Sequence, residues 1–494
     1  MFFRKNLLVK RGASRRVTIS NFAGGIDSVS GDDFVGTSTA RLSYNVNGES
    51  GVLRENKGVR VFGLPLDGVE TPVTAEGKKI KKVWYFRRFD SEANRADDRI
   101  LFLSYDNHLY GVSTSGGKVE KITETAFCEE PKAVNYRLKG KDVMIFCSAA
   151  DDMKVYDGNT LTVVENAPKV DCACLHYDRL FVTTLNDKNT IMFSDDLDPT
   201  GWEVGPDEAG YITMTDERGA IVGIISFLNY LYVFREYGIS RLTAYGAQES
   251  FNLNHLFLTT GKIVKDTVRV CGETVIFLTE QGLFQFDGSN AKKILSNLDG
   301  LFEGCDNGHA TAAYVNGRYY LACNLNFDDG FKTQNERNGC VNNAVVEIDL
   351  FNGGVRLMRG LDVVSLAGIT GDGINELLLC SGENQPCSVY IGKLTEGGKF
   401  FDKNSLKVWV CPTTDLNNTV GRKQLIDVTL TTKENLTMIV KVDGVEHFYD
   451  VIGQERGQRM AINLYGEDFT VTFVADTEKL WLSRPQFTYK EYDR

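Results

Sequence analysis

A short apolar run recurs along the chain about every 45 residues, and this recurrence limits the choice of fold more strongly than any other feature. Each run follows a turn residue and is rich in aromatic and β-branched side chains. The seven copies are DDRILFLS (97–104), GKDVMIF (140–146), YDRLFVT (177–183), NYLYVFR (229–235), GETVIFL (272–278), NGRYYLA (316–322) and NELLLCS (375–381). A repeat of this length predicts one structural unit that is built many times in succession.

The spacing between the copies is regular but drifts. The intervals are 43, 37, 51, 44, 44 and 58 residues when the reference positions are Ile100, Val143, Leu180, Leu231, Val275, Tyr319 and Leu377. Most copies are followed by a second pair of runs that closes on a glycine turn, as in VYDGNTLTVV (155–164) and LFQFDGSNAKKI (283–294). Asp-Gly and Asn-Gly steps supply the positive φ angles of tight hairpins, and the 48 glycines against 9 prolines suit many such turns.

About four short strands in each unit of roughly 45 residues are typical of a β-propeller blade. The sequence therefore predicts an all-β fold in which residues 76–400 form a six- to eight-bladed β-propeller. Within residues 401–494, strand-like stretches such as FTVTFVA (469–475) alternate strictly between apolar and polar side chains, and they predict a C-terminal antiparallel β-module resembling a sandwich. Residues 1–75 predict an extended basic N-terminal arm with lead-in strands.

Charge and motifs narrow the class of function. The formal net charge is -11, which argues against a protein whose whole surface grips nucleic acid, although DNA could still slide past acidic walls. The 11 cysteines contain no CxxC pair, and the N-terminus has no signal-peptide core, so we expect synthesis in a reducing cytoplasm. Phosphate-binding, zinc-protease and serine-nucleophile motifs are all missing from the sequence. We therefore expect no enzyme activity, no cofactor and no metal site.

One acidic stretch is a candidate functional site. IMFSDDLDPTGWEV (191–204) places Asp195, Asp196 and Asp198 directly after an apolar strand. Aspartates that cap backbone amides in a turn explain this pattern best. A calcium loop remains an alternative, because three carboxylates could supply hard oxygen ligands, and a catalytic role is a third reading. The stretch also faintly resembles the Asp-box of sialidase-type propellers, although the expected glycine is missing.

Two segments resemble bacteriophage head-completion and tubular tail proteins, such as the packaged-DNA stabilisation and nozzle-type proteins of short-tailed phages. NFAGGIDS (21–28) followed by RLSYNVNGESGVLRENKGVRVFG (41–63) is similar to the opening of those proteins, and IMFSDDLDPTGW (191–202) is similar to one of their strands with its Asp-Pro and Trp. FREYGISRL (234–242) and GLFQFDG (282–288) look like their blade strands. The matching residues are Asn45, Gly51, Leu53, Arg54, Lys57, Gly58, Phe193, Ser194, Asp198, Pro199 and Trp202, with Lys57 standing where an arginine is more usual.

The resemblance implies a virion structural protein, located at the tail or portal vertex and assembled in the host cytoplasm. Such a protein would form a ring with itself, commonly a hexamer, that extends the portal channel and helps to retain or conduct the genome without sequence-specific DNA binding. Its other partners would be portal or adaptor proteins and further tail proteins. A basic arm could then dock on an acidic neighbour or stay a solvated tail; its residues are Arg4, Lys5, Lys10, Arg11, Arg15 and Arg16.

Two other functions stay open on the residues alone. A carbohydrate-binding or glycan-cleaving propeller should bring several carboxylates and arginines to one mouth of the propeller. A propeller that serves as a docking scaffold for other proteins is the third candidate.

Overall fold

The computed structural model describes residues 14–32, 35–90, 94–205, 208–246, 248–259, 261–371, 374–414 and 421–492. Strands dominate throughout, as the sequence predicts, and the chain divides into two compact units. One unit is built from Val59–Gly353 and Gly360–Leu394, and the other from the described residues up to Gly58 together with Gly354–Arg359 and Thr395–Arg494. Within these ranges no helix is long and apolar enough to cross a membrane.

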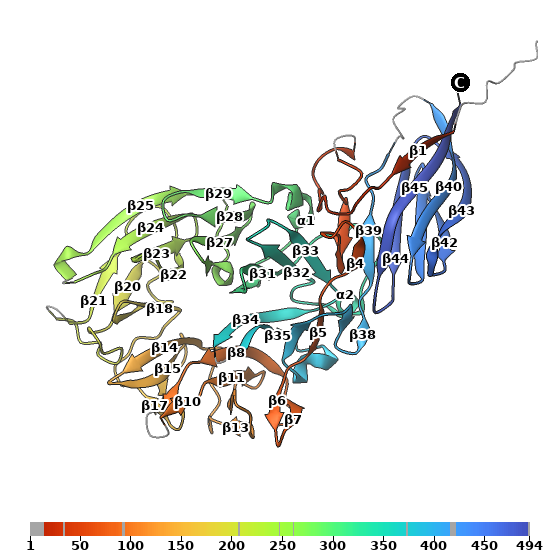
Figure 1. The fold of residues 1–494 in the computed structure, drawn as a ribbon. Helices are drawn as coiled ribbons and strands as arrows, with labels where there is room; N and C mark the ends of the chain where they lie inside the picture. Colours follow the sequence, from red (N-terminus) through yellow and green to blue (C-terminus); the bar gives the residue numbers. More distant parts are fainter. Residues whose placement is uncertain are drawn as a thin grey trace, which may run out of the picture. The chain divides into compact units, whose positions relative to one another are not determined.

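The larger unit is a succession of sheets, and in the first six of them the strands follow in sequence order (Figure 1). The first three sheets are β8 (Ile80–Phe86), β11 (Arg99–Ser104), β12 (Leu109–Ser113) and β13 (Glu120–Lys121); β14 (Lys132–Leu138), β15 (Lys141–Cys147), β16 (Lys154–Tyr156) and β17 (Leu161–Val163); and β18 (Cys172–His176), β19 (Arg179–Thr183), β20 (Thr190–Phe193) and β21 (Gly210–Thr213). The next two are β22 (Ile221–Phe227), β23 (Tyr230–Arg235), β24 (Gly238–Thr243) and β25 (Asn252–Leu258); and β26 (Arg269–Cys271), β27 (Thr274–Thr279), β28 (Gly282–Phe286) and β29 (Ala291–Ile294).

Two more sheets complete this unit. The sixth includes β30 (Thr311–Val315), β31 (Arg318–Cys323) and β32 (Ala344–Asp349), and the seventh has the order β34 (Val363–Gly371), β35 (Ile374–Ser381), β36 (Gly392–Thr395) and β5 (Gly58–Val61). Short elements fill the connections: β6 (Gly63–Leu66) with β7 (Val69–Pro72), β9 (Phe89–Asp90) with β10 (Arg95–Ala96), and the helices η2 (Gln248–Ser250), η3 (Lys265–Thr267), η4 (Ser296–Leu298), α1 (Asp299–Phe302), α2 (Gln334–Asn338) and η5 (Pro386–Val389).

The reference positions of the sequence repeat occupy one equivalent place in the fold. Each lies on the second strand of its sheet, namely β11, β15, β19, β23, β27, β31 and β35. A second strand has a hydrogen-bonded neighbour on both sides and packed side chains on both faces, so it reads as a continuous apolar run. In β19, for example, Leu180, Phe181 and Val182 are fully buried. The repeat in the sequence is therefore a repeat of sheets.

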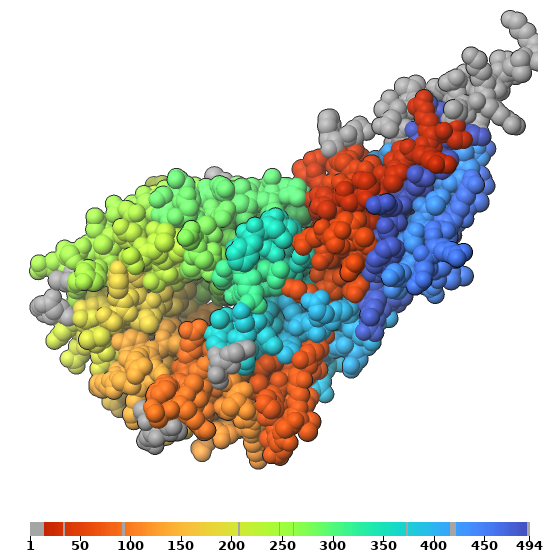
Figure 2. Space-filling view, viewed as in Figure 1, coloured from red at the N-terminus to blue at the C-terminus, as the bar shows by residue number. Residues whose placement is uncertain are grey.

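Apolar clusters lie between neighbouring sheets rather than in one central core. One joins the first and second sheets through Leu101 and Phe146, and another joins the third and fourth through Phe181 and Leu231. The first and seventh sheets also share a cluster, which contains Ile100, Phe102, Ile369 and Leu378. The first strands contact each other in the same order, from β14 to β18 and on to β22, and from β26 through β30 and β34 to β8. The sheets of this unit therefore stack side by side in chain order, which Figure 2 shows as a sequence of colours from orange to cyan.

The smaller unit has two sheets around one core. One sheet has the order β2 (Leu42–Tyr44), β39 (Lys407–Val410), β44 (Phe469–Ala475), β41 (Leu436–Val442) and β42 (Val445–Val451). The other has the order β3 (Val46–Asn47), β4 (Leu53–Glu55), β45 (Trp481–Tyr492), β40 (Arg422–Thr432) and β43 (Gln454–Gly466), with β1 (Arg15–Thr18) also paired to β45; β33 (Val355–Arg359) and the pair β37 (Lys399–Phe400) and β38 (Lys403–Asn404) belong to this unit as well. Both sheets contribute to a single buried cluster.

The division into units differs from the boundaries predicted at residues 75 and 400. The structure divides the chain near residues 58 and 394, and it places the described part of the first 58 residues with the C-terminal strands. The reason is strand pairing: Leu42 lies opposite Val410, and Leu53 lies opposite Leu482. The N-terminal segment is thus part of the β-module in its described residues, not a separate arm.

Candidate functional site

Only two of the six arginines and lysines that were predicted to dock on a partner lie in the described residues. Arg4, Lys5, Lys10 and Arg11 lie outside the described residues. Arg15 and Arg16 lie in β1, where the backbone pairs with β45 and both side chains are exposed. The guanidinium of Arg15 makes an ion pair with Glu491 at 2.7 Å. Docking by this segment stays a prediction, and β1 is already used as a sheet strand.

Asn45, the first residue of the phage-like motif, is a buried structural centre. Its side-chain amide donates hydrogen bonds to the carbonyl oxygens of Arg359 (2.8 Å) and Leu406 (2.7 Å), and its side-chain oxygen accepts one from the Arg359 amide at 2.9 Å. Its own backbone N–H donates to the Leu357 carbonyl oxygen at 2.8 Å. Asn45 has φ = 58°, a left-handed conformation that asparagine tolerates better than most residues. This residue therefore joins three chain segments of the smaller unit.

The next motif residues also have structural places. Gly51 has φ = 79° in a turn, and Leu53 is 1% exposed in the core of the β-module. A Cβ on Gly58 would lie 2.2 Å from a backbone carbonyl oxygen, so only glycine fits there. Arg54 is exposed and Lys57 is half-buried. The motif thus combines positions that the fold requires with two cations at or near the surface.

The second motif segment follows β20. Phe193 and Ser194 are buried, and the Ser194 hydroxyl accepts a hydrogen bond from the Leu180 amide and donates one to the Asp195 carbonyl oxygen, both at 3.0 Å. Trp202 packs into the cluster between the second and third sheets. These side chains fix the connection after β20 against the neighbouring sheet.

The aspartates in this segment form a turn. Asp195 and Asp198 face each other across a β-bridge, and the Asp198 carboxylate accepts a hydrogen bond from the Thr200 amide at 3.0 Å. Burial opposes ionisation of Asp198, but the hydrogen bonds from Thr200 and the charge of Lys139 hold its pKa below 3.8. Asp196 is exposed. In the described ranges no group of three or more His, Cys, Asp or Glu side chains could hold a metal ion.

We expect Asp198→Ala to destabilise the protein by about 1–2 kcal/mol, because a partly buried carboxylate that caps a turn is lost. Asp196→Ala is the matched control, and we expect a change within about 0.5 kcal/mol because this side chain is exposed. Denaturant unfolding followed by circular dichroism measures both. Equal effects of the two substitutions would contradict the turn assignment.

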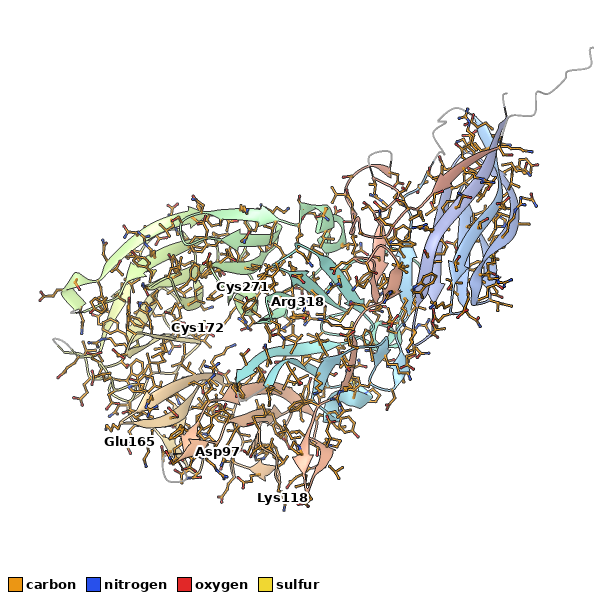
Figure 3. The ribbon with its side chains drawn as sticks, viewed as in Figure 1. Asp97, Lys118, Glu165, Cys172, Cys271 and Arg318 are labelled. Carbon is orange, nitrogen blue, oxygen red and sulfur yellow. The ribbon has the colours of Figure 1, made fainter. Side chains whose placement is uncertain are left out.

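A cavity of about 640 Å³ lies in the bigger unit, at the centre of the sheets. The first strands of all seven sheets line it, and small residues leave it open: Ala133, Ala173, Gly223, Ala312, Ala313, Ala367 and Gly368. Figure 3 places the lining residue Cys172 on the inner side of the sheets and Asp97, Lys118 and Glu165 towards the outer rim. Its volume is in the usual range for sites that bind small molecules.

Cations dominate the charged lining of this cavity. Five lining residues are basic and one, Asp266, is acidic; the basic ones are Lys82, Arg87, Lys132, Lys265 and Arg269. All three lysines of the cavity form ion pairs. Lys82 pairs with Glu130 at 3.0 Å, Lys132 with Asp266 at 3.1 Å and Lys265 with Asp171 at 2.5 Å. The last two pairs connect η3 with the second and third sheets.

The position of Asp266 indicates a positive potential in the cavity. Burial would raise the pKa of its carboxyl, yet the charges of Lys132, Lys82 and Arg269 lower it far below 3.8. The side chain keeps 46% of its surface exposed because the cavity admits solvent. Asp266 is therefore ionised and surrounded by cations.

Two arginines of the cavity bind backbone carbonyl groups. Arg87 donates to the Thr370 carbonyl oxygen at 2.7 Å, and Arg269 donates to those of Ala312 and Val268 at 2.7 Å each. Each arginine thereby reaches the first strand of a neighbouring sheet, either β34 or β30. These basic residues were not predicted from the sequence, although they share a signal: most lie at or just before the first strand of a repeat.

Ser240, His255 and Asp216 form a line that looks like a hydrolase triad. The Ser240 hydroxyl lies 2.9 Å from Nδ1 of His255, and Nε2 of His255 lies 3.7 Å from the Asp216 carboxylate. Ser240 is fully buried, so no substrate reaches its hydroxyl. The Asp216 carboxylate makes a shorter ion pair with Arg235, at 2.6 Å. This group is a structural network.

Buried His176 predicts acid sensitivity. Its Nδ1 lies 2.8 Å from the Ser226 hydroxyl, and burial lowers its pKa from 6.5 to about 4. As the pH falls, the unfolded chain binds this proton first, so stability is complete above pH 6.5 and is lost towards pH 4. The loss should reach about 3 kcal/mol. His176→Gln should flatten this part of the stability profile, whereas Ser226→Ala should keep it; unfolding measured from pH 4 to 7 tests both.

No family model matches the chain, and no curated protein matches it by sequence. Among solved structures it is similar to a crystal structure of BBS1N in complex with ARL6DN, soaked with lead, with 12% identity and a TM-score of 0.42 over 68% of this chain and 97% of that chain. The computationally designed Ika8 protein is similar with 9% identity and a TM-score of 0.36, over 68% of this chain and 99% of that one. At these TM-scores the likenesses carry no argument about function or partners.

Proposed function

We propose that the chain is a ring-forming structural protein of a bacteriophage virion, which extends the portal channel and helps to retain or conduct the genome. In this proposal the seven sheets close into a seven-bladed propeller, which supplies a stiff wedge for a ring of copies. The apolar cluster shared by the first and seventh sheets supports closure. A heterologous interface between wedges then closes with cyclic symmetry, for which a hexamer is our expectation.

The observation that supports this function best is the place of Asn45. Asn45 is the first of the matching residues in the resemblance to phage proteins, and its side chain makes three hydrogen bonds within the smaller unit, two of them buried and one partly buried. A motif that the fold itself requires is expected to persist in proteins of one fold, whereas a surface match could arise by chance. Partners are then the chain itself, portal or adaptor proteins and other tail proteins, with DNA passing through without sequence-specific contacts.

A carbohydrate-binding or glycan-cleaving propeller has less support. The cavity does bring carboxylates and cations together, but Asp171, Asp266 and Glu130 each lie within 3.1 Å of a lysine amine. Glycan cleavage needs a carboxylic acid whose pKa is raised, and the pKa of Asp266 is shifted in the opposite direction. The cavity therefore favours a structural protein with an ion-paired centre over a glycosidase.

Native mass spectrometry and negative-stain imaging of the purified protein test the proposal, both alone and mixed with a portal–adaptor complex. We expect rings of one defined size, or ring formation on the portal–adaptor complex. A protein that stays strictly monomeric in both samples would overturn the proposal. Release of sugars from a panel of bacterial surface glycans would then favour the alternative.

A further inference from the structure

We propose that the central cavity is a binding site for one small oligoanion that carries phosphate groups. The cavity and the carboxylates paired with it hold five cations and three anions, which leaves two positive charges in excess. This excess stands out in a chain whose net charge is -11. The inference concerns the inside of the larger unit and does not depend on the proposed role in a virion.

Arg269 is the strongest candidate for direct contact with the ligand. Its Nε and one terminal nitrogen donate to backbone carbonyl oxygens, and no hydrogen bond of the other terminal nitrogen is found among the described residues. Its guanidinium lines the cavity beside η3 without an ion-pair partner in those residues. A planar guanidinium with donors to spare matches the spacing of phosphate oxygens, and such bonds are strong because both partners are charged.

The ion pair between Lys132 and Asp266 gives the ligand a second contact. The two side chains keep 30% and 46% of their surfaces exposed, so water in the cavity reaches both. A phosphate group that enters can take over the Lys132 amine from the Asp266 carboxylate, since it offers more negative charge to the same donor. Lys82 and Lys265 line the same space. The small lining residues leave room for a ligand of a few phosphate groups, and the volume suits a small molecule rather than a duplex.

Isothermal titration calorimetry of the full chain with pyrophosphate tests the site, with citrate as a second oligoanion that lacks phosphorus. We expect one pyrophosphate per chain, affinity that falls as salt is added, and weaker binding of citrate. Arg269→Gln should weaken pyrophosphate binding by about tenfold. Asp266→Asn should strengthen it by about fivefold, because it removes the carboxylate that competes for Lys132. Lys292→Gln, at an exposed position of β29, removes the same charge elsewhere and should leave binding unchanged.

We expect Arg269→Gln to weaken pyrophosphate binding and Asp266→Asn to strengthen it. Loss of folding would weaken binding in both variants, so it cannot explain this pair of results. If Arg269→Gln does not fold, Asp266→Asn still decides the question. The proposal fails if neither the wild type nor Asp266→Asn binds pyrophosphate. It also fails if Asp266→Asn binds no more tightly than the wild type, or if Lys292→Gln weakens binding as much as Arg269→Gln does. Equal affinity for citrate and pyrophosphate would overturn the assignment to phosphate.

Discussion

Asn45→Ala is expected to lower the free energy of unfolding by about 4 kcal/mol. The substitution removes three side-chain hydrogen bonds and leaves the carbonyl oxygens of Arg359 and Leu406 without their amide donor, and each buried group without a partner costs about 1–3 kcal/mol. Alanine also tolerates φ = 58° less well than asparagine, which adds about 1 kcal/mol. Chemical denaturation followed by near-ultraviolet circular dichroism measures the loss.

Two companion variants separate these contributions. Asn45→Gly keeps the positive φ without strain, so it should recover about 1 kcal/mol relative to Asn45→Ala. Asn47→Ala removes one local hydrogen bond, to the Glu49 amide, in a half-buried position and should cost at most about 1 kcal/mol. If Asn47→Ala proved as costly as Asn45→Ala, the hydrogen bonds of Asn45 would not be the cause.

Arg235→Met should cost about 3 kcal/mol, because it leaves a carboxylate without its buried partner. The Arg235 side chain is 1% exposed and donates to the Gly219 carbonyl oxygen (2.6 Å), the Asp216 carboxylate (2.6 Å) and the Asn189 side chain (3.0 Å). These partners come from the third sheet and from the connection between the third and fourth sheets. The loss should therefore appear as a lower melting temperature of the larger unit.

Arg218→Met is the control for this prediction. Arg218 also pairs with Asp216, at 3.1 Å, but its side chain is 20% exposed. A partly solvated pair contributes little, so we expect a loss of about 1 kcal/mol or less. A loss in Arg218→Met equal to that in Arg235→Met would mean that burial of the guanidinium does not decide the effect.

The repeat could be predicted because each copy is defined by residues that lie close together in the sequence. An almost fully buried second strand such as β27, in which Val275, Ile276 and Phe277 are 0% exposed, gives a continuous apolar run wherever it occurs. The glycine turns beside it reveal the next hairpin. Alternation likewise revealed β40, β41, β42, β44 and β45, which each keep one face on the core. β43 was missed: eight of its thirteen residues are exposed, and its first four are all exposed, so the alternation is weak there.

The cavity and the N-terminal strands could not be predicted, because their partners lie far apart in the chain. Nothing near Leu42 indicates that it lies opposite Val410. Similarly, Lys132 belongs to the second sheet and Asp266 belongs to η3. Only the stacking of the sheets brings the Lys132 amine to 3.1 Å from the Asp266 carboxylate. Their one local signal is position: a basic residue recurs near the start of several first strands. This signal can be recognised only when it is known where each repeat begins in the sequence.

The place of β5 beside β36 has a consequence for biosynthesis. The ribosome releases residues 58–61 long before it adds residues 392–395, so the early strand must wait with its edge uncovered for most of translation. Prematurely terminated chains keep that edge open and expose it to proteases and to other nascent polypeptides. Only a chain synthesised at least as far as β36 can bury it, so synthesis of residues 392–395 acts as a checkpoint on which molecules enter any larger assembly.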